Sequence, residues 1–463
     1  MRYRSTRDAG PALAGFGELL LGGTAPDGGL YVPESWPQVD AAGLAGRSYA
    51  EVVAVMVAPF AAPFFTPEEV EAMAESSYRG FRHPDVAPLE QLAADDWLLD
   101  LTWGPTLSFK DYAMALLGAM MEAALERSGE RVLVLGATSG DTGSAAIEAL
   151  RGRSHVDVVI FYPEGRVSEI QRRQMTTVEE RNVHAVAIEG TFDDCQDLVK
   201  VLLADHELLP KHRLAGFNSI NWARVAPQTA FAAWATTCLG IPPGGMVFSV
   251  PTGNFGNIYA AYAATRMGIP TSRLVVGSNR NHGVTDLISD GRMTVEPVVP
   301  TLAPAMDIQV PSNMERLLTE LLGGPGTPVA EAVRRLRTDG SFDLPGDALA
   351  RLRELFSAAW LDDEATSATI AEVHRETGRL VDPHTAIGIA AGRQSRAPGT
   401  TLVSLATAHP AKFPEAVLAA TGIEPELPAE LAGIVERTER HDLLPARLEA
   451  VRGFVSEAVS EPE

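Results

Sequence analysis

The sequence predicts an α/β protein with two lobes of mainly parallel sheet covered by helices, preceded by a mainly helical N-terminal extension. Two observations predict this fold class. From about Asp96 onward, short runs rich in β-branched residues alternate with helical patterns, which is typical of parallel sheets with both faces covered. The chain also has 463 residues, more than the roughly 250 to 300 that one hydrophobic core organises, so several domains are expected.

The predicted division places the extension at residues 1–95, the first lobe at 96–215 and the second lobe at 216–463. The extension holds a glycine-rich turn and two helical patterns, at 49–58 and 67–78. Elements expected in the first lobe are 112–126, 132–135, 144–150, 156–162, 183–188 and 194–204. Elements expected in the second lobe are 246–250, 258–267, 274–277, 329–337, 347–359, 363–376 and 401–406. A fold of this kind is expected to bind its ligand in a cleft between the lobes, at the carboxyl ends of the strands.

Composition and charge narrow the range of partners. Lys plus Arg number 38 and Asp plus Glu 60, and the resulting net charge of -22 repels phosphodiester backbones, so nucleic acid is not an expected partner. The two cysteines form no disulfide framework and show no metal-ligand spacing with the ten histidines. No apolar run approaches the ~18 residues of a membrane span, and the first ten residues lack the apolar segment of a secretion signal. We therefore expect a cytoplasmic monomer or homodimer without a metal site.

A lysine, Lys110, stands in the segment GPTLSFKDYA, beside Phe109 and just before the helical pattern 112–126. Such a setting can hold the amine partly desolvated, which favours the neutral form that a Schiff base requires. Alone, this residue could also be a lysine at the start of a helix whose ammonium group reaches solvent. Further along, GATSGDTG at 136–143 predicts a strand-to-helix turn whose backbone N–H groups can bind an anion. Together the two segments indicate pyridoxal-phosphate chemistry.

Two more loops join a predicted strand to a predicted helix. In PTGNFGN, Gly253 and Gly256 allow the backbone to approach an anion closely, and the following helix adds its N-terminal partial charge. The loop could also be an ordinary tight turn. In TAHPAKF, which begins at Thr407, a hydroxyl could be presented at the same edge of the sheet. These loops are therefore candidates for binding a phosphorylated cofactor.

Seven motifs occur in a fixed order between Ala25 and Phe413: APDGGLYVPE, GPTLSFKD, ATSGDTG, NSINWAR, VPTGNFGN, AMDIQVPSN and TAHPAKF. In this set the chain resembles the threonine synthases of the longer type with an N-terminal extension, which belong to the tryptophan-synthase-β-like, fold type II pyridoxal-phosphate enzymes. The resemblance implies a carbon–oxygen lyase acting on phosphate. Its reaction would convert O-phospho-L-homoserine and water into L-threonine and phosphate, by γ-elimination and β-hydration, in threonine biosynthesis.

The resemblance also implies which residues bind the cofactor, pyridoxal 5'-phosphate. Lys110 would form the internal aldimine and then move protons. The cofactor phosphate would be held by the loop Gly253, Asn254, Phe255, Gly256 and Asn257. Thr407 would hydrogen-bond the pyridine nitrogen, and a neutral hydroxyl there makes the cofactor a tempered electron sink. Asp141 stands where shorter relatives place an asparagine near the 3'-oxygen, where a carboxylate repels a phenolate unless one of them is protonated. Asp141 could instead cap the following helix.

For the substrate, the resemblance implies that its α-carboxylate is held by the turn Thr138, Ser139, Gly140 and Thr142. The substrate phosphate is an anion and needs cationic partners. Arginine is the best candidate residue type, because its guanidinium group binds phosphate through two parallel hydrogen bonds. The candidates are Arg172 and Arg173, and Asn221 with Arg224. A solvated helix face is an alternative interpretation of the two adjacent arginines. The family motifs also contain residues to which their spacing assigns no role: Asp307, Asn313 and Lys412.

One position departs from the family pattern, because Trp103 stands where many relatives carry histidine before the GPT segment. A wall of the apolar cleft is the simpler interpretation of this indole, but it could reshape the substrate pocket. A paralogue acting on another phosphorylated or γ-substituted amino acid therefore stays open. A non-catalytic sensor of metabolites is a second hypothesis, against which Lys110 argues. Threonine dehydratase and cysteine synthase activities are chemically closer rivals, but neither requires a second anion site.

Overall fold

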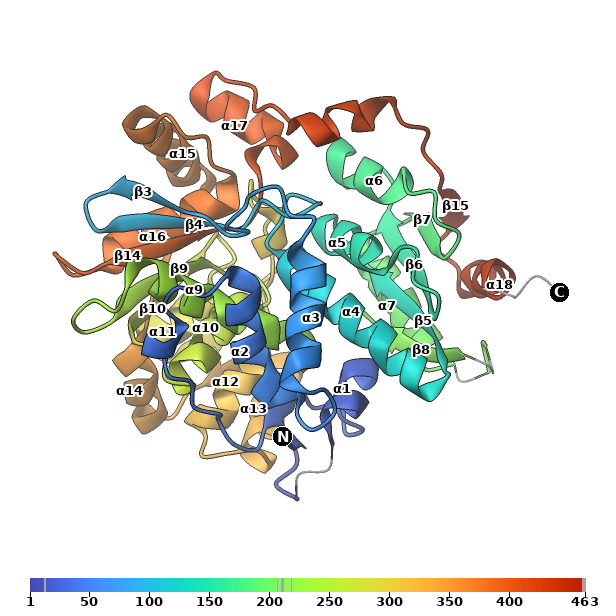
Figure 1. Cartoon of the computed structure of the whole chain (residues 1–463), viewed down its shortest axis with the longest axis horizontal. Helices are drawn as coiled ribbons and strands as arrows, with labels where there is room; N and C mark the ends of the chain where they lie inside the picture. Colours follow the sequence, from blue (N-terminus) through green and yellow to red (C-terminus); the bar gives the residue numbers. More distant parts are fainter. Residues whose placement is uncertain (12–13, 206, 210–211, 218, 460–463) are drawn as a thin grey trace. The chain divides into compact units, whose positions relative to one another are not determined.

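The structure is a computed structural model that describes residues 1–11, 14–205, 207–209, 212–217 and 219–459. Contacts divide the chain into two compact units whose segments alternate along the sequence (Figure 1). Unit 1 consists of Met1–Leu19, Thr24–Phe109 and Ser219–Pro425. Unit 2 consists of Leu20–Gly23, Lys110–Asn218 and Glu426–Glu463. Both units are built on mainly parallel sheets with helices packed on them, so the predicted fold class is confirmed.

The main sheet of unit 1 has the strand order β13–β10–β9–β14–β4–β3. Its strands are β3 (Leu89–Ala93), β4 (Asp96–Asp100), β9 (Met246–Pro251), β10 (Thr271–Ser278), β13 (Phe356–Trp360) and β14 (Leu402–Ala406). Neighbouring strands are parallel except for β3 and β4, which are antiparallel. Strand β9 is buried along its whole length, as expected for a central strand covered on both faces.

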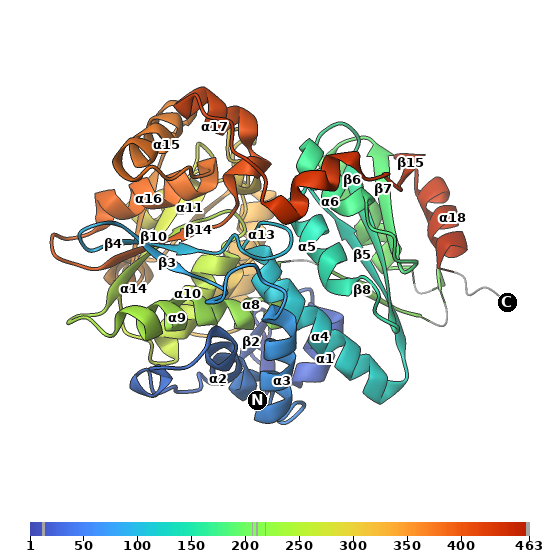
Figure 2. The same ribbon diagram turned by 45° about the horizontal axis from the view of Figure 1, so that its top comes forward.

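Helix α16 (Pro383–Ser395) packs on one face of this sheet, and α9 (Thr229–Leu239) and α10 (Gly256–Arg266) lie on the other (Figure 2). The approach of α16 is close because glycines face the strands. A Cβ on Gly388 would lie 2.9 Å from Pro251, and one on Gly392 would lie 2.8 Å from the Ser249 Cβ. The middle and last turns of α16 therefore lie directly against β9.

Further elements belong to unit 1, except that Leu20–Gly23 at the end of the first helix belong to unit 2. The N-terminal part supplies β1 (Tyr3–Ser5), α1 (Phe16–Gly22), β2 (Tyr31–Pro33), η1 (Ala42–Leu44), α2 (Tyr49–Ala61) and α3 (Pro67–Tyr78). The later part supplies α8 (Trp222–Val225), η2 (Ala226–Gln228), α11 (Gly283–Asp290), β11 (Arg292–Thr294), η3 (Pro304–Met306), α12 (Met314–Leu321), α13 (Thr327–Thr338), β12 (Ser341–Asp343), α14 (Gly346–Leu355), α15 (Asp363–Thr377), η4 (Pro410–Lys412) and α17 (Pro414–Thr421). Strand pairs β1–β2 and β11–β12 are antiparallel.

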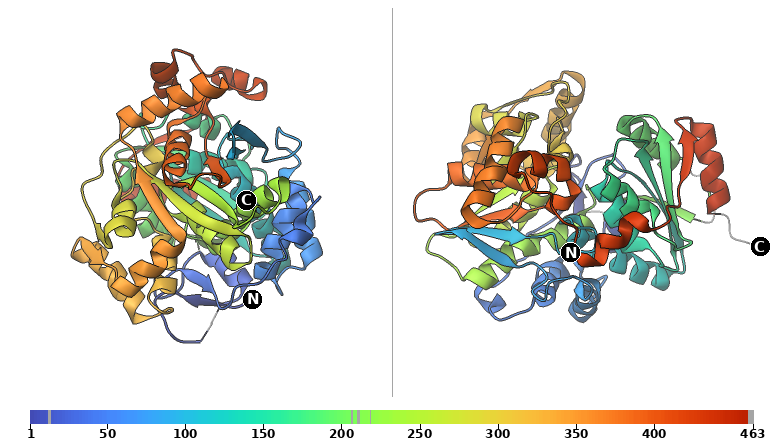
Figure 3. Two further views of the ribbon diagram at one scale, coloured as in Figure 1. Left: turned by 90° about the vertical axis from the view of Figure 1, so that its left-hand side faces the viewer. Right: turned by 90° about the horizontal axis from the view of Figure 1, so that it is seen from above.

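The sheet of unit 2 has the order β15–β7–β6–β5–β8 and is parallel throughout. Its strands are β5 (Arg131–Ala137), β6 (Val156–Pro163), β7 (Val183–Glu189), β8 (His212–Gly216) and β15 (Asp442–Pro445). The helices of this unit are α4 (Lys110–Ser128), α5 (Asp141–Leu150), α6 (Glu169–Thr176), α7 (Phe192–Leu203), η5 (Ala429–Glu436) and α18 (Leu448–Ala458). Figure 3 shows α18 beside this sheet. Alternate strand residues such as Leu133 and Val159 form a core with α7 and α18, in which Cys195 is buried.

One predicted element is wrong in part, and one predicted division is not followed by the compact units. The helix expected over 347–359 ends at Leu355, and Phe356–Trp360 form an edge strand parallel to β10, because pairing and the burial of Phe356 override an alanine-rich pattern. The domain boundaries at 95 and 215 stay a prediction. The units follow a different course, since β4 pairs with β14 and β15 pairs with β7. Among the described residues, no helix has the length and apolarity needed to cross a membrane.

Candidate functional site

The loop between β9 and α10 has the backbone geometry of an anion cradle. Phe255 adopts the left-handed conformation, with a φ of 62°, and α10 begins at the next residue, Gly256. A left-handed residue followed by helical ones turns successive N–H groups into one concavity, and the first helical N–H groups have no partner within the helix. The strain at a non-glycine residue, about 1 to 3 kcal/mol, is offset by the buried Phe255 ring, which stacks on Phe356 with centroids 6.2 Å apart.

The side chains around this loop fit a phosphate group. A Cβ on Gly253 would clash with the carbonyl oxygen of Ala305 in η3, so the backbone there leaves no room for another residue. The amide nitrogen of the buried Asn257 has no hydrogen-bond partner among the described residues. A buried donor without a partner costs free energy unless a ligand accepts from it. The cradle therefore offers backbone and side-chain donors to an anion, as predicted for the cofactor phosphate.

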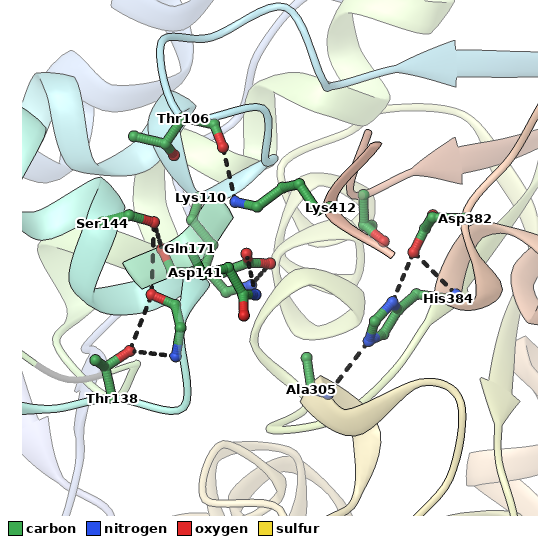
Figure 4. A network of polar contacts seen from close by, with 12 residues as sticks. Thr106, Lys110, Thr138, Asp141, Ser144, Gln171, Ala305, Asp382, His384 and Lys412 are labelled. Atoms are coloured by element: carbon green, nitrogen blue, oxygen red, sulfur yellow. Dashed lines mark hydrogen bonds and ion pairs between the residues drawn. The ribbon is translucent and has the colours of Figure 1, made fainter. Parts of the chain in front are cut away.

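A buried histidine supports the wall of the cradle. The Nδ1 of His384 lies 2.6 Å from a carboxylate oxygen of Asp382, and its Nε2 accepts from the backbone N–H of Ala305 at 3.2 Å (Figure 4). Because Nε2 accepts a hydrogen bond, Nδ1 is the nitrogen that donates to Asp382. Sequence reasoning missed this pair. An aspartate followed by proline signals a helix start, and Asp382 does cap α16, but nothing in that signal points to the cradle.

Thr407 follows β14 and is 5% exposed. Its N–H donates to the hydroxyl of Thr385 at 3.2 Å, and its carbonyl accepts from the N–H of Phe109 at 3.0 Å. Its own hydroxyl makes no hydrogen bond within the described part of the chain. The geometry thus fixes the backbone of Thr407 and leaves the hydroxyl available, as its predicted contact with a pyridine nitrogen requires.

The loop before Lys110 is fastened to the TAHPAKF segment. Ser108 and Ala408 form an antiparallel bridge, and the fully buried Lys412 donates from its Nζ to the carbonyl of Thr106 at 2.7 Å (Figure 4). Leu107 within this loop is left-handed, with a φ of 64°. Lys412, to which sequence spacing assigned no role, therefore holds the backbone that leads to the lysine.

In unit 2, Lys110 is the first residue of α4, and its Nζ lies 3.2 Å from a carboxylate oxygen of Asp141 (Figure 4). The other oxygen of Asp141 accepts from the side-chain amide of Gln171 at 2.8 Å. Gly140 occupies the N-cap position of α5, with a φ of 139°, and a Cβ there would clash with Gln171. Asp141 therefore lies inside the first turn and faces the lysine, and Gln171 fixes its orientation.

The turn before α5 is shaped by one hydroxyl. Thr138 Oγ1 accepts from the N–H groups of Gly140 at 2.9 Å and Gly143 at 2.8 Å. Ser139 is exposed and Thr142 is half-buried. Thr138 thus organises the turn, while Ser139, Thr142 and the first turn of α5 are the groups that a carboxylate could meet. Their predicted contact with the substrate stays a prediction.

The two adjacent arginines of α6 do not share the environment expected of a phosphate site. Both pair with Glu439, Arg172 in close contact and Arg173 at 3.8 Å. The Arg173 guanidinium also pairs with Glu169 one turn earlier, at 2.9 Å. Their charge is therefore partly neutralised inside unit 2, and the predicted role of Arg172 at the substrate remains untested.

Arg224 is a buried cation with spare hydrogen-bond capacity. It lies in α8, is 5% exposed, and its Nη1 has no partner among the described residues. Burial lowers the pKa of Arg224 to about 10. Asn221 caps the same helix by accepting from the N–H of Ala223 at 2.9 Å. Asn218, the first residue of the NSINWAR motif, lies outside the described residues. Of the predicted cations, Arg224 has the geometry that best suits an anionic ligand.

Trp103, the residue that departs from the family pattern, is held by a hydrogen bond and by a ring contact. The indole N–H donates to Asp100 at 3.0 Å, and the ring lies against His83 with centroids 5.0 Å apart. Asp100 is itself buried and ion-paired with Arg379. These contacts fit the simpler interpretation of Trp103 as a fixed wall.

Comparisons with known proteins show the family to which this chain belongs. The chain matches the family profiles for the threonine synthase N terminus over residues 2–78, for pyridoxal-phosphate dependent enzymes over 86–342, and for the threonine synthase C-terminal region over 385–455. It is 47% identical to the threonine synthase of Pseudomonas aeruginosa, over 99% of this chain and 98% of that protein.

Two solved structures are similar over nearly the whole chain. The pyridoxal-phosphate-bound threonine synthase of Brucella melitensis superposes with a TM-score of 0.96 at 44% identity, covering 100% of both chains. Yeast threonine synthase superposes with a TM-score of 0.93 at 34% identity, covering 99% of this chain and 98% of that one. The family resemblance seen in the motifs is confirmed. This chain belongs to the threonine synthase family of pyridoxal-phosphate-dependent enzymes.

Proposed function

We propose that this protein is a threonine synthase, which converts O-phospho-L-homoserine and water into L-threonine and phosphate with pyridoxal 5'-phosphate as cofactor. The specific reaction rests on near-complete similarity to threonine synthases. As a binding site, the proposal is carried by one observation. The N–H of Phe109, the residue before Lys110, is hydrogen-bonded to Thr407, the proposed contact of the pyridine ring.

The residues that would hold the cofactor are Lys110, Asp141, the cradle Gly253, Asn254, Phe255, Gly256 and Asn257, and Thr407. When bound, pyridoxal phosphate withdraws electrons from the substrate's Cα, which makes the Cα proton removable and allows phosphate to leave from Cγ. A neutral Thr407 hydroxyl leaves this withdrawal moderate, which suits elimination followed by addition of water better than amino transfer.

Lys110 is proposed to attach the cofactor and to move protons at Cα and Cβ of the substrate. A general base must be neutral when it accepts a proton, and a carboxylate 3.2 Å away favours the ammonium form instead. Asp141 is therefore proposed to accept the proton that Lys110 gives up, so that the carboxyl group is protonated while the amine is free. Gln171, which donates to Asp141, orients that carboxylate in either state.

The substrate is proposed to bind through both of its anionic groups. Its α-carboxylate would meet the turn Thr138, Ser139, Gly140 and Thr142, and its phosphate would meet Arg224, with Asn221 and Arg172 as further candidates. Arg224 has the strongest support because its buried Nη1 has no partner in the described chain. A phosphate oxygen would satisfy that donor and neutralise the buried charge.

The test is phosphate release from O-phospho-L-homoserine by the purified protein, with threonine identified as the co-product. Lys110→Ala is expected to abolish both turnover and the cofactor's yellow absorbance. Lys200→Ala, which removes an exposed lysine paired with Asp197, is the matched control and should retain both. Threonine formation at an undiminished rate in Lys110→Ala would refute the role of the lysine.

A threonine-synthase-like paralogue acting on another phosphorylated or γ-substituted amino acid is the alternative, which the departure from the family pattern at Trp103 leaves open. A yellow protein that releases phosphate without threonine, or that does not turn over O-phospho-L-homoserine, would point to this alternative and direct the search to other γ-substituted amino acids. The proposal further includes a cytoplasmic location and a monomeric or homodimeric state, without nucleic-acid or membrane partners. Sedimentation of the purified protein measures that state directly.

A further inference from the structure

A single arginine, Arg316, connects three segments that the sequence motifs had presented separately. It lies in α12 and is 0% exposed. Its Nε donates to the carbonyl of Tyr31 at 2.9 Å, its Nη2 to the carbonyl of Ile220, and its Nη1 to the side-chain oxygen of Asn313. The guanidinium carbon also lies 5.6 Å from the centroid of the Trp222 ring. All these residues belong to unit 1.

Asn313 passes this constraint to the phosphate cradle. With its oxygen held by Arg316, its amide nitrogen must point away, and it donates to the carbonyls of Ser219 and Asn254, each at 3.1 Å. The backbone N–H of Asn313 donates to the same Asn254 carbonyl, also at 3.1 Å. Two donors thus fix one carbonyl oxygen at the centre of the cradle loop.

Fixing the Asn254 carbonyl also fixes a donor. In a planar trans peptide, the C=O of one residue and the N–H of the next point in opposite directions. The N–H of Phe255 is therefore directed away from Asn313, and the left-handed Phe255 aligns it with the N–H groups that begin α10. Without the two bonds from Asn313, this peptide could rotate and remove a donor from the concavity.

We propose that Arg316 is a positioning residue for the cofactor phosphate, acting through Asn313 on the peptide between Asn254 and Phe255. This inference rests on the proposed function, because it takes the cradle to bind pyridoxal phosphate. Arg316 cannot touch the cofactor phosphate in this role. Its guanidinium donors are hydrogen-bonded to three acceptors inside unit 1. The bond to the Asn313 side-chain oxygen also determines which side of that amide is the oxygen and which is the nitrogen.

The competing explanation is that Arg316 only stabilises the packing of α12 against Trp222 and the N-terminal segment. The two explanations differ in what they predict for ligands. A purely structural role would alter folding and affect any cofactor form equally. A positioning role would weaken pyridoxal 5'-phosphate selectively and leave pyridoxal, which lacks the phosphate, nearly unaffected.

The experiment uses Asn313→Asp, which keeps the acceptor for Arg316 but loses the amide donor to Asn254. Full-length protein is freed of cofactor by dialysis, and the return of absorbance is titrated with pyridoxal 5'-phosphate and with pyridoxal. The dissociation constant for pyridoxal divided by the dissociation constant for pyridoxal 5'-phosphate should fall by about tenfold to a hundredfold. This is the loss expected when a hydrogen-bond donor to a charged group, here the cofactor phosphate, is removed. Asn182→Asp is the matched control, because Asn182 donates to the carbonyls of Leu150 and Val156 in unit 2.

An unchanged ratio in Asn313→Asp, with a loss of stability like that of Asn182→Asp, would overturn the proposal. If Asn313→Asp does not fold, Arg316→Lys carries the same comparison, because it keeps the buried charge but cannot reach three acceptors. Failure of the proposed function would look different. In that case the wild-type protein itself would bind neither cofactor form, and no ratio could be measured.

Discussion

Replacing Arg224 by methionine should make the protein more stable and its substrate binding weaker. Arg224 is 5% exposed, and its Nη1 has no partner among the described residues, so the folded protein holds a charge that water would solvate better. Burial lowers the pKa of this group to about 10, well below its ordinary value. At about 1.4 kcal/mol for each tenfold change in the proton equilibrium, this corresponds to about 3 kcal/mol against the charged form. Methionine has a similar length, fills the same apolar space and carries no charge.

We therefore expect Arg224→Met to raise the free energy of unfolding by about 1 to 3 kcal/mol in the absence of substrate. The same change removes the cation proposed for the substrate phosphate. Loss of a charge-assisted hydrogen bond should raise the KM for O-phospho-L-homoserine by about tenfold to a hundredfold. The trade of function against stability is the mark of a residue kept for its ligand.

The assay pairs urea unfolding of the substrate-free enzyme with steady-state kinetics. Arg393→Met is the control, because Arg393 is ion-paired at 2.8 Å with Asp96, whose side chain is 1% exposed. Breaking that pair should destabilise the protein and leave KM unchanged. If Arg224→Met were destabilising and its KM were normal, Arg224 would be a structural cation and the reasoning from its unpartnered nitrogen would fail.

Two predictions concern pH. Burial raises the pKa of Glu148 to about 7, so the ionisation of this carboxyl group destabilises the folded protein increasingly between pH 4.5 and 7. Glu148→Gln should therefore increase the free energy of unfolding, measured with urea, by about 1 kcal/mol at pH 8 and leave it unchanged at pH 4. An equal gain at both pH values would contradict this. Burial lowers the pKa of His409 to about 4, so its contribution is present above pH 6.5 and is lost as the pH falls toward 4. His409→Asn, which can still accept the N–H of Ala411 as a cap, should reduce that acid loss, and an unchanged acid transition would show that other groups cause it.

Periodicity and turn chemistry predicted most of the individual strands and helices. The strand expected at 246–250 is β9 and the helix expected at 258–267 is α10, because both are long enough for burial to impose a clear pattern. The strand β13 was hidden, since FSAAW continues the alanine-rich composition of α14 and only its pairing with β10 distinguishes it. Long-range pairing of this kind leaves little signal in a local window.

The candidate site divides in the same way. Loops with special backbone requirements, such as the one containing Phe255, were found because glycine and asparagine mark them. Arg316, His384 and the partners of Lys412 were not found as functional residues. Each acts through a carbonyl or N–H group that is distant in sequence, and a buried arginine on an amphipathic helix looks like any surface charge. Only the contacts in the folded structure distinguish these positioning residues from residues that are exposed to solvent.

The pairing of β4 with β14 has a consequence for synthesis of the chain. Residues Asp96–Asp100 need Leu402–Ala406 as their parallel neighbour, so about 300 residues of chain must be made before that edge of β4 is covered. A ribosome stalled before β14 would hold a hairpin of β3 and β4 with one open edge, a template for pairing with other chains. Limited proteolysis of stalled nascent chains should therefore cleave near β4 until residue 406 has emerged. Until then the open edge of β4 should need protection by chaperones.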